Sequence, residues 1–172
     1  NNFINEKKGN YMVFMPSFEY LNKVYARYIE MYGEEGTIVQ EENLTEIKKE
    51  KFLDNFNEGN NITGFTVVGG MFSEGVDLPG DKLIGAIIVG VGFPMVSIEN
   101  NIISEYFEAN GFDYSYTYPG INKVLQSVGR VIRTEYDTGR ILLIDRRYLS
   151  TKYKLILPKE WEIKDYKFKC KK

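Results

Sequence analysis

The longest apolar run of the sequence, LIGAIIVGV at residues 83–91, is the feature that most restricts the fold. It is too short to cross a membrane as a helix, which takes about 20 apolar residues. The run is rich in β-branched side chains and does not alternate between apolar and polar positions. A strand of this kind is buried on both faces, which is typical of a parallel sheet covered by helices. The run therefore predicts a central parallel strand.

The rest of the sequence extends this strand into an alternation of strands and helices. Further strands are expected at residues 11–15, 36–40, 65–68 and 140–144, and helices at 18–32, 43–57, 98–110 and 126–133. Such alternation implies an α/β fold with a mainly parallel open sheet and helices on both faces. A chain of 172 residues is expected to form a single domain, with its core at residues 10–148 and a basic tail at 150–172 that can fray.

Residues at the helix ends support these boundaries. Ser17 is a suitable N-cap and Gly33 a suitable C-terminal stop for the first of these helices. Asn43 and Glu46 have the spacing of a capping box for the next helix. The inward-facing side chains expected of that second helix are Ile47, Leu53 and Phe56. The segment GFDYSYTYPG at 111–120 is expected to be an aromatic loop.

Composition excludes several kinds of chemistry. The sequence has no histidine, which removes Ser-His-Asp and Cys-His nucleophile systems and histidine metal sites. Its one cysteine, Cys170, excludes an internal disulfide and a cysteine-ligated metal cluster, so a cytoplasmic setting is the default. The net charge is −2, so contact with a polyanion would have to come from a local patch.

The stretch LQSVGRVIRTEYDTGRILLIDRRY at residues 125–148 carries a candidate anion site. If the helix runs as expected, Gln126, Arg130 and Arg133 lie within about 60° of each other on one face. The opposite face would carry apolar side chains at positions 124, 125, 128 and 132. A solvated polar face and an anion site both fit this pattern. An anion site suits arginine because its rigid fork binds phosphate oxygens in pairs.

A second candidate is the glycine-rich segment GGMFSEGVD, which follows the strand predicted at 65–68. It offers backbone N–H groups, the Ser73 hydroxyl and the carboxylates of Glu74 and Asp77. Its glycines let the chain approach a ligand closely or adopt positive φ angles. A tight strand exit without a ligand remains the alternative. In a parallel sheet such loops lie at the carboxyl ends of the strands, where function is usually found.

Together these segments resemble the XPD/DinG branch of the superfamily-two helicases. QSVGRVIR matches the Q-x-x-G-R-x-x-R pattern of motif VI, and the following TEYDTGRILLIDRRY resembles that branch's Asp-x-Gly turn and strand ending in Asp-x-Arg. GGMFSEGVDLPGDKLIGAIIVGVGFP is similar to motif V, and YMVFMPSFEYL to motif IV. The three motifs occur in the family's order and cover most of residues 10–148. The resemblance implies a RecA-like second motor domain of an ATP-dependent DNA helicase.

The resemblance also implies residue roles. Arg133 would be the arginine finger that reaches the γ-phosphate of ATP, with Arg130 beside it, because a guanidinium stabilises charge on the transferred phosphoryl group. Gln126 would position the γ-phosphate or the attacking water. The residues expected to line the nucleotide side of the cleft are Glu74, Gly75, Asp77 and Gly129. Ser17 and Ser73 would donate to phosphates of single-stranded DNA.

Other helicase elements are missing from the sequence. It contains no Gly-Lys dipeptide, and hence no P-loop, and without histidine it has no D-E-x-H box. In the family these elements belong to an N-terminal motor domain. That domain would precede residue 1 and make most of the contacts to ATP and Mg²⁺. Expected partners are therefore that domain and single-stranded DNA, with no membrane and no metal site. The isolated chain is expected to lack ATPase activity. The alternative is a non-catalytic nucleic-acid-binding or regulatory module on the same fold.

Two further features have more than one interpretation. The dense aromatic side chains could stack bases or pack a long connection, and packing is the simpler interpretation. They are Tyr106, Phe107, Phe112, Tyr114, Tyr116 and Tyr118. The C-terminal lysines are expected to be a solvated terminus, with contact to nucleic acid as the alternative. They are Lys164, Lys167, Lys169, Lys171 and Lys172.

Overall fold

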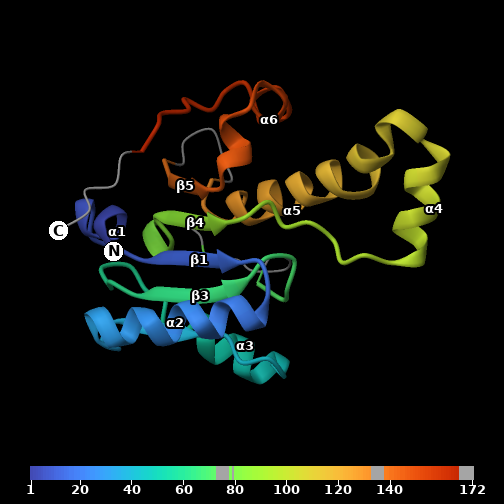
Figure 1. Ribbon diagram of the computed structural model, residues 1–172. Helices are drawn as coiled ribbons and strands as arrows, with labels where there is room; N and C mark the ends of the chain where they lie inside the picture. Colours follow the sequence, from blue (N-terminus) through green and yellow to red (C-terminus); the bar gives the residue numbers. More distant parts are fainter. Residues whose placement is uncertain (73–77, 79, 133–137, 167–172) are drawn as a thin grey trace.

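A five-stranded parallel sheet forms the centre of the molecule (Figure 1). The computed structural model describes residues 1–72, 78, 80–132 and 138–166. The strands are β1 (Tyr11–Met15), β2 (Thr37–Val39), β3 (Thr63–Val67), β4 (Gly85–Val89) and β5 (Arg140–Ile144). Their order is β2-β3-β1-β4-β5, and every pair is parallel. The predicted α/β class with a parallel open sheet is confirmed.

Six α-helices accompany the sheet in the described part of the chain. They are α1 (Asn2–Glu6), α2 (Phe18–Tyr32), α3 (Glu46–Leu53), α4 (Ile98–Tyr106), α5 (Tyr118–Val128) and α6 (Thr151–Ile156). Short 3₁₀ turns cover Gly80–Lys82, Glu108–Asn110 and Arg146–Leu149, and a π-helix covers Asp113–Thr117. None of the helices in the described ranges is long and apolar enough to cross a membrane.

Helices cover both faces of the sheet, as predicted. On one face, side chains of β1 and β4 pack with α3 and α5; this core includes Phe14, Ile88, Phe52 and Val124. On the other face, alternate side chains of the same strands pack with α1 and α2; this core includes Val13, Ile87, Phe3 and Leu21. The predicted strand at 83–91 is therefore buried on both faces. It is shorter than expected and lies beside the middle strand, β1.

Two of the cap predictions are confirmed and one is wrong. The Ser17 hydroxyl accepts from the backbone N–H of Tyr20 at 3.2 Å and begins α2, which ends before Gly33. The predicted capping box of Asn43 and Glu46 is wrong, because the N-cap of α3 is Thr45.

The inward face of α3 also differs from the prediction. The side chain of Ile47 is exposed, with 68% of its area accessible, and α3 ends at Leu53 instead of 57. Phe52 sets the buried face, because its ring packs on Phe72 and Phe56 at centroid distances of 4.4 and 5.7 Å. Phe56 is buried as expected, but beyond the end of the helix.

The segment at 111–120, expected to be a loop, is helical. The π-helix leads directly into α5, so this helical segment begins well before the predicted start at residue 126 and ends early, at Val128. Small polar side chains permit this, since the Ser115 hydroxyl donates to the carbonyl of Asn100 at 2.9 Å and the Thr117 hydroxyl donates to Asp113 at 2.9 Å. The predicted helix at 98–110 is α4, followed by a 3₁₀ turn after residue 107.

The C-terminal region is more ordered than the predicted basic tail. The helix α6 buries Tyr153, and Leu157 follows it into a small core with Val91, Ile121 and Tyr148. The chain then continues as far as Tyr166, the last described residue. The expectation of a frayed tail from residue 150 is therefore wrong for residues 150–157. Residues 167–172 lie outside the described ranges.

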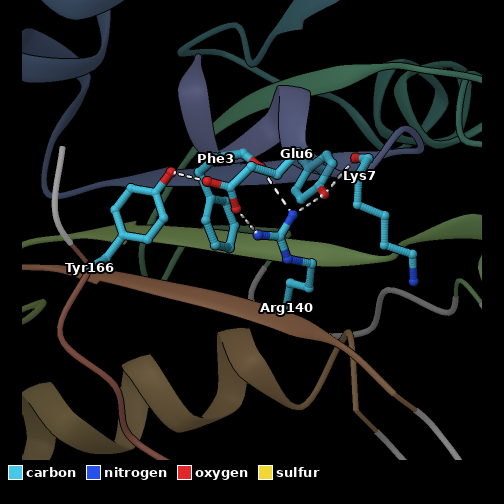
Figure 2. A network of polar contacts seen from close by, with 6 residues as sticks. Phe3, Glu6, Lys7, Arg140 and Tyr166 are labelled. Atoms are coloured by element: carbon cyan, nitrogen blue, oxygen red, sulfur yellow. Dashed lines mark hydrogen bonds and ion pairs between the residues drawn. The ribbon is translucent and has the colours of Figure 1, made fainter. Parts of the chain in front are cut away.

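Arg140 ties the N-terminal helix to the edge strand β5 (Figure 2). Its guanidinium pairs with Glu6, donates to the carbonyl of Phe3 at 3.1 Å and lies 4.3 Å from the centre of the Phe3 ring. The Tyr166 hydroxyl donates to Glu6 at 2.5 Å from the other side. Three segments far apart in sequence therefore meet at the ion pair of Arg140 and Glu6.

A second clamp joins the ends of β4 and β5. Arg147 donates to Asp145 through Nε and Nη2, at 2.9 and 2.7 Å, and lies 4.5 Å from the centre of the Phe93 ring. The Tyr148 hydroxyl donates to the carbonyl of Gly90 at 2.9 Å. The Asp-x-Arg pair seen in the sequence is thus a structural element that orders the chain after both strands. Hydrogen bonds from Arg147 hold the pKa of Asp145 below its ordinary value.

Arg140→Ala is expected to lower the free energy of unfolding by about 1–3 kcal/mol, because it removes the ion pair with Glu6 and the hydrogen bond to the carbonyl of Phe3. The matched control is Arg27→Ala. Arg27 pairs with Glu30 on α2, and the two side chains are 64% and 66% exposed, so its loss should change stability by less than about 0.5 kcal/mol. Urea denaturation measures both; equal effects would contradict the tethering role of Arg140.

Asp145→Asn is expected to remove a stabilisation that depends on pH. Because the pKa of Asp145 is lowered in the folded state, its carboxylate stabilises the protein above the unfolded-state pKa of about 4. This contribution is lost as the pH falls through the lower folded-state pKa. The difference in stability between wild type and variant, measured by urea denaturation, should therefore shrink on acidification below about pH 4. A difference that stays constant on acidification would show that the carboxylate charge is not involved.

Candidate functional site

The chain leaves β1, β3 and β4 at one edge of the sheet, because parallel strands place their carboxyl ends together. Pro16 and Ser17 follow β1, Gly69 and Gly70 follow β3, and Gly90 follows β4. A Cβ atom on Gly90 would lie 3.8 Å from Cβ of Pro16, so the exits of β1 and β4 are neighbours. Ser17 is exposed at the N-terminus of α2. Its hydroxyl accepts the capping bond and keeps its own hydrogen to donate.

Two side chains of the segment after β3 pack on the sheet face that α5 covers. Phe72 and Leu78, near its two ends, are buried in one core with Val124 and Val128 of α5 and with Val131. The structure thus brings the two candidate segments of the sequence together. Residues 73–77, which include Ser73, Glu74, Gly75 and Asp77, lie outside the described ranges.

Lys123 of α5 lies against the glycine exit of β3. Gly69 has a φ of +72°, and a Cβ atom there would be 3.1 Å from Cδ and 3.5 Å from Nζ of Lys123. The sequence analysis did not select Lys123. A signal was present, because Lys123, Gln126 and Arg130 have the spacing i, i+3, i+7 of one helix face. A cationic group therefore lies beside the loop that carries the predicted motif V.

Gln126, Gly129 and Arg130 lie together at the end of α5. Gln126 is exposed on the last turn, Gly129 is the exposed C-cap, and Arg130 is half-buried in the turn that follows. The expectation that Arg130 and Arg133 share this helix is wrong for Arg130. The helix ends because the N–H of Val131 bonds to the carbonyl of Val128 at 2.8 Å, a tighter turn that buries Val131. Arg133 lies outside the described ranges.

The fold does not require glycine at position 129. Its φ of −60° and ψ of −6° suit any residue. A Cβ atom there would meet the carbonyl oxygens of Leu125 and Gln126 at 3.4 and 3.5 Å, which are ordinary contacts. Glycine therefore leaves this exposed end of α5 flat, so that another molecule can come close to the backbone.

Gln40, after β2, orders the exit of β3. Gln40 is buried, and its side-chain Oε1 accepts from the backbone N–H of Val67 at 3.0 Å. Its backbone N–H donates to the carbonyl of Phe65 at 2.8 Å. Nothing in the sequence pattern marks this side chain, because its contacts come from strand order. Its effect is to fix the path of the chain into Gly69 and Gly70.

Within the described ranges, no group of three or more acidic or cysteine side chains could hold a metal ion. The polar groups at the end of α5 are instead a guanidinium, an amide and a nearby ammonium group. These are donors, and they fit the oxygen atoms of an anion.

Comparison with known proteins agrees with this arrangement. Residues 1–164 match the family described as helicase C-terminal domain. The ATP-dependent DNA helicase DinG of Photobacterium profundum is 39% identical over 121 residues, which are 67% of this chain and 17% of that relative. The ATP-dependent DNA helicase CHL1 of Debaryomyces hansenii is 30% identical over 175 residues, 88% of this chain and 21% of that relative. The chain thus spans roughly a fifth of the length of such relatives.

Solved structures show the same fold. A structure named XPD helicase has a TM-score of 0.73 at 22% identity, over 90% of this chain and 28% of that one. The C-terminal domain of the DEAD-box protein Dbp5 has a TM-score of 0.52 at 16% identity, over 87% of this chain and 71% of that one. With the family match over nearly the whole chain, the conclusion is that this chain belongs to the helicase C-terminal domain family, in the branch of DinG and XPD.

Proposed function

We propose that this chain is the second motor domain of an ATP-dependent DNA helicase that moves along single-stranded DNA. ATP would be hydrolysed at the interface with an N-terminal motor domain. The observation that carries this proposal is the shared core of Phe72, Leu78, Val124 and Val128, which holds the loop after β3 against α5. This packing brings the motif V and motif VI segments side by side. The names of the relatives, ATP-dependent DNA helicases, support the same activity.

The nucleotide would contact the end of α5. Arg133 is the proposed arginine finger, with Arg130 and Gln126 as further donors to the γ-phosphate region or the attacking water. A preplaced guanidinium stabilises the charge that develops on the transferred phosphoryl group without reorganising in the reaction. The loop residues Glu74, Gly75 and Asp77 would line the same side of the cleft, and Gly129 would let the nucleotide or the partner domain approach. Most contacts to ATP and Mg²⁺ would come from the N-terminal domain.

Single-stranded DNA would bind at the carboxyl edge of the sheet. Ser17 would donate its hydroxyl hydrogen to a phosphate beside the N-terminus of α2, where the helix dipole also favours an anion. Ser73, on the loop after β3, would contact a neighbouring phosphate. Because this loop also packs on α5, a change at the nucleotide would alter the grip on DNA. Closure of the cleft on ATP and reopening after hydrolysis would be a hinge motion that shifts the strand stepwise.

The alternative is a non-catalytic nucleic-acid-binding or regulatory module on the same fold. The end of α5 argues against it. A domain that does not contact ATP would not need Gln126, Gly129 and Arg130 together at this helix end. The backbone conformation and the surroundings of Gly129 would accept a larger residue, so the fold does not explain the glycine.

Arg133→Ala in the full-length helicase is expected to reduce DNA-stimulated ATP turnover by about 10³-fold, because the transition state loses its guanidinium. ATP binding should persist, because most contacts lie in the other domain. Arg27→Ala, on the exposed face of α2, is the control and should retain full turnover. The 172-residue chain alone should show no turnover above the uncatalysed rate. Unchanged turnover in Arg133→Ala would favour the non-catalytic module.

Gly129→Ala separates a functional need for glycine from a structural one. Its free energy of unfolding should stay within about 0.5 kcal/mol of wild type, because the added Cβ meets only ordinary contacts. ATP turnover of the full-length helicase should still fall by about tenfold or more, because a close approach is blocked. Gly85→Ala gives the opposite pattern: its Cβ would lie 2.5 Å from the Tyr11 ring and 2.8 Å from the carbonyl of Arg140, so stability should fall by about 1–3 kcal/mol. Full turnover in Gly129→Ala would remove position 129 from the site.

A further inference from the structure

The helix α4 exposes an apolar stripe to solvent. It stands beside the π-helix and the start of α5, away from the sheet (Figure 1). At about 100° per residue, Ile98, Ile102 and Tyr106 fall within an arc of about 80° on one face. Their exposed fractions are 75%, 61% and 79%, and no residue of α4 is fully buried. Met95 and Val96, just before the helix, are exposed as well. A contiguous apolar surface of this kind marks an interaction site more often than single exposed side chains do.

The packed face of α4 is the polar one. Asn100 and Ser104 lie opposite the stripe and are half-buried. The carbonyl of Asn100 accepts from the Ser115 hydroxyl at 2.9 Å, and a Cβ atom on Gly111 would overlap the carbonyl of Ser104. The helix therefore turns small polar side chains toward its own domain and apolar ones outward. This orientation is the reverse of that of an ordinary surface helix.

Carboxylates border the stripe on both sides. On the same helical projection, Glu105 lies about 20° beyond Ile98, and Glu99 lies about 20° beyond Tyr106. Both are exposed, as is Glu108 after the helix, and none of the three has an ion-pair partner within the described part of the chain. The hydrogen bond from its own backbone N–H, with one from Ser97, lowers the pKa of Glu99, so this carboxylate is charged at neutral pH.

The sequence around α4 contains no compensating positive charge. Between Lys82 and Lys123 there is no lysine or arginine. Two cationic side chains from elsewhere in the fold lie near this region. Lys152 forms an ion pair with Asp113 of the π-helix, and Arg147 forms one with Asp145 and lies over the Phe93 ring. The surface is thus apolar in the middle and negative at its borders.

This charge pattern decides what can cover the stripe. Phosphates of nucleic acid and anionic lipid headgroups would be repelled by the glutamates. A second copy related by two-fold symmetry would bring the same carboxylates face to face. Among the aromatic rings nearby, Phe107 and Tyr114 stack on each other at 4.1 Å, so each covers one face of the other. A surface with apolar and cationic side chains fits instead.

We propose that α4 docks a helix of a partner protein that carries an apolar stripe flanked by lysine or arginine. The nine residues of α4 span about 13.5 Å, which matches two to three turns of the partner helix. Ile98, Ile102 and Tyr106 supply the apolar contact, as in other helix-on-helix recognition. Glu99 and Glu105 pair with cationic side chains on either side and set which helices are accepted.

The test uses the 172-residue chain and two synthetic helical peptides of about 12 residues, with the same leucine stripe and with either lysine or glutamate flanks. Fluorescence anisotropy should detect binding of the lysine peptide, with an affinity that falls at high salt, and no binding of the glutamate peptide. The double variant Ile98→Gln/Ile102→Gln should bind the lysine peptide at least about tenfold more weakly. Glu99→Gln/Glu105→Gln should weaken binding and remove most of its salt dependence.

Ile47→Gln is the matched control, because Ile47 is an exposed isoleucine on α3, remote in sequence from the stripe. It should bind the lysine peptide like wild type, and all variants should keep the wild-type melting temperature. The proposal is overturned if neither peptide binds or if the two bind equally. It is also overturned if the isoleucine variant abolishes self-association of the chain, vesicle binding or single-strand binding instead. A large drop in melting temperature for Ile98→Gln/Ile102→Gln would show that the stripe is packed within the domain.

Discussion

The burial of β1 on both faces is the constraint on which the rest of this domain depends. Its five side chains alternate between two cores, with Met12 and Phe14 in one and Tyr11, Val13 and Met15 in the other. A strand buried in this way must have neighbours on both edges and helices on both faces. Since all its neighbours are parallel, the chain returns through crossovers and leaves each strand at the same edge. The convergence of loops that makes a site possible is therefore a consequence of the core.

The position of α5 depends on close approaches at glycine. A Cβ atom on Gly120 would lie 2.6 Å from the carbonyl of Val91, so α5 can begin against the exit of β4 only because this side chain is absent. Further along α5, Lys123 lies over Gly69 in the same way. These two contacts, together with the burial of Val124 and Val128, set the height and rotation of the helix. The outward direction of Gln126 follows from that rotation.

The strands β1, β4 and β5 could be predicted from sequence because each contains an uninterrupted apolar run that is followed by a turn residue. The match is closest for β1 and β5, where the observed bounds are the predicted ones. Helix ends were less predictable, because they depend on single hydrogen bonds. Asn43 and Thr45 are both acceptable caps by sequence, and only the packing of Phe52 selects Thr45. The Gly, Tyr, Ser and Pro residues at 111–120 suggested a loop, and tertiary bonds of Ser115 and Thr117 make it helical.

In the candidate site, too, local sequence features could be predicted, whereas features that depend on tertiary contacts could not. Local motifs proposed Ser17, Gln126, Gly129 and Arg130 as candidates, since their spacing is a property of the sequence. Gln40 could not be found in this way, because its bond to Val67 exists only when β2 and β3 are paired. The predicted grouping of Arg130 with Gln126 on one helix failed because Val131 is buried, and that burial turns the chain one residue after Gly129. Sequence patterns therefore identify candidate side chains, and tertiary packing determines where those side chains point.

Charge is distributed along one helical segment so that two surfaces stay separate. Residues 113–128 are helical without interruption, from the π-helix to the end of α5. The acidic α4 packs at the first end, and Lys123, Gln126 and Arg130 gather toward the second. A phosphate is favoured at the second end and opposed at the first, whereas a cationic helix has the opposite preference. Because the helical segment between them is rigid, the two charge clusters cannot fold back and neutralise each other. The domain therefore carries a cationic end and an acidic apolar end at the same time.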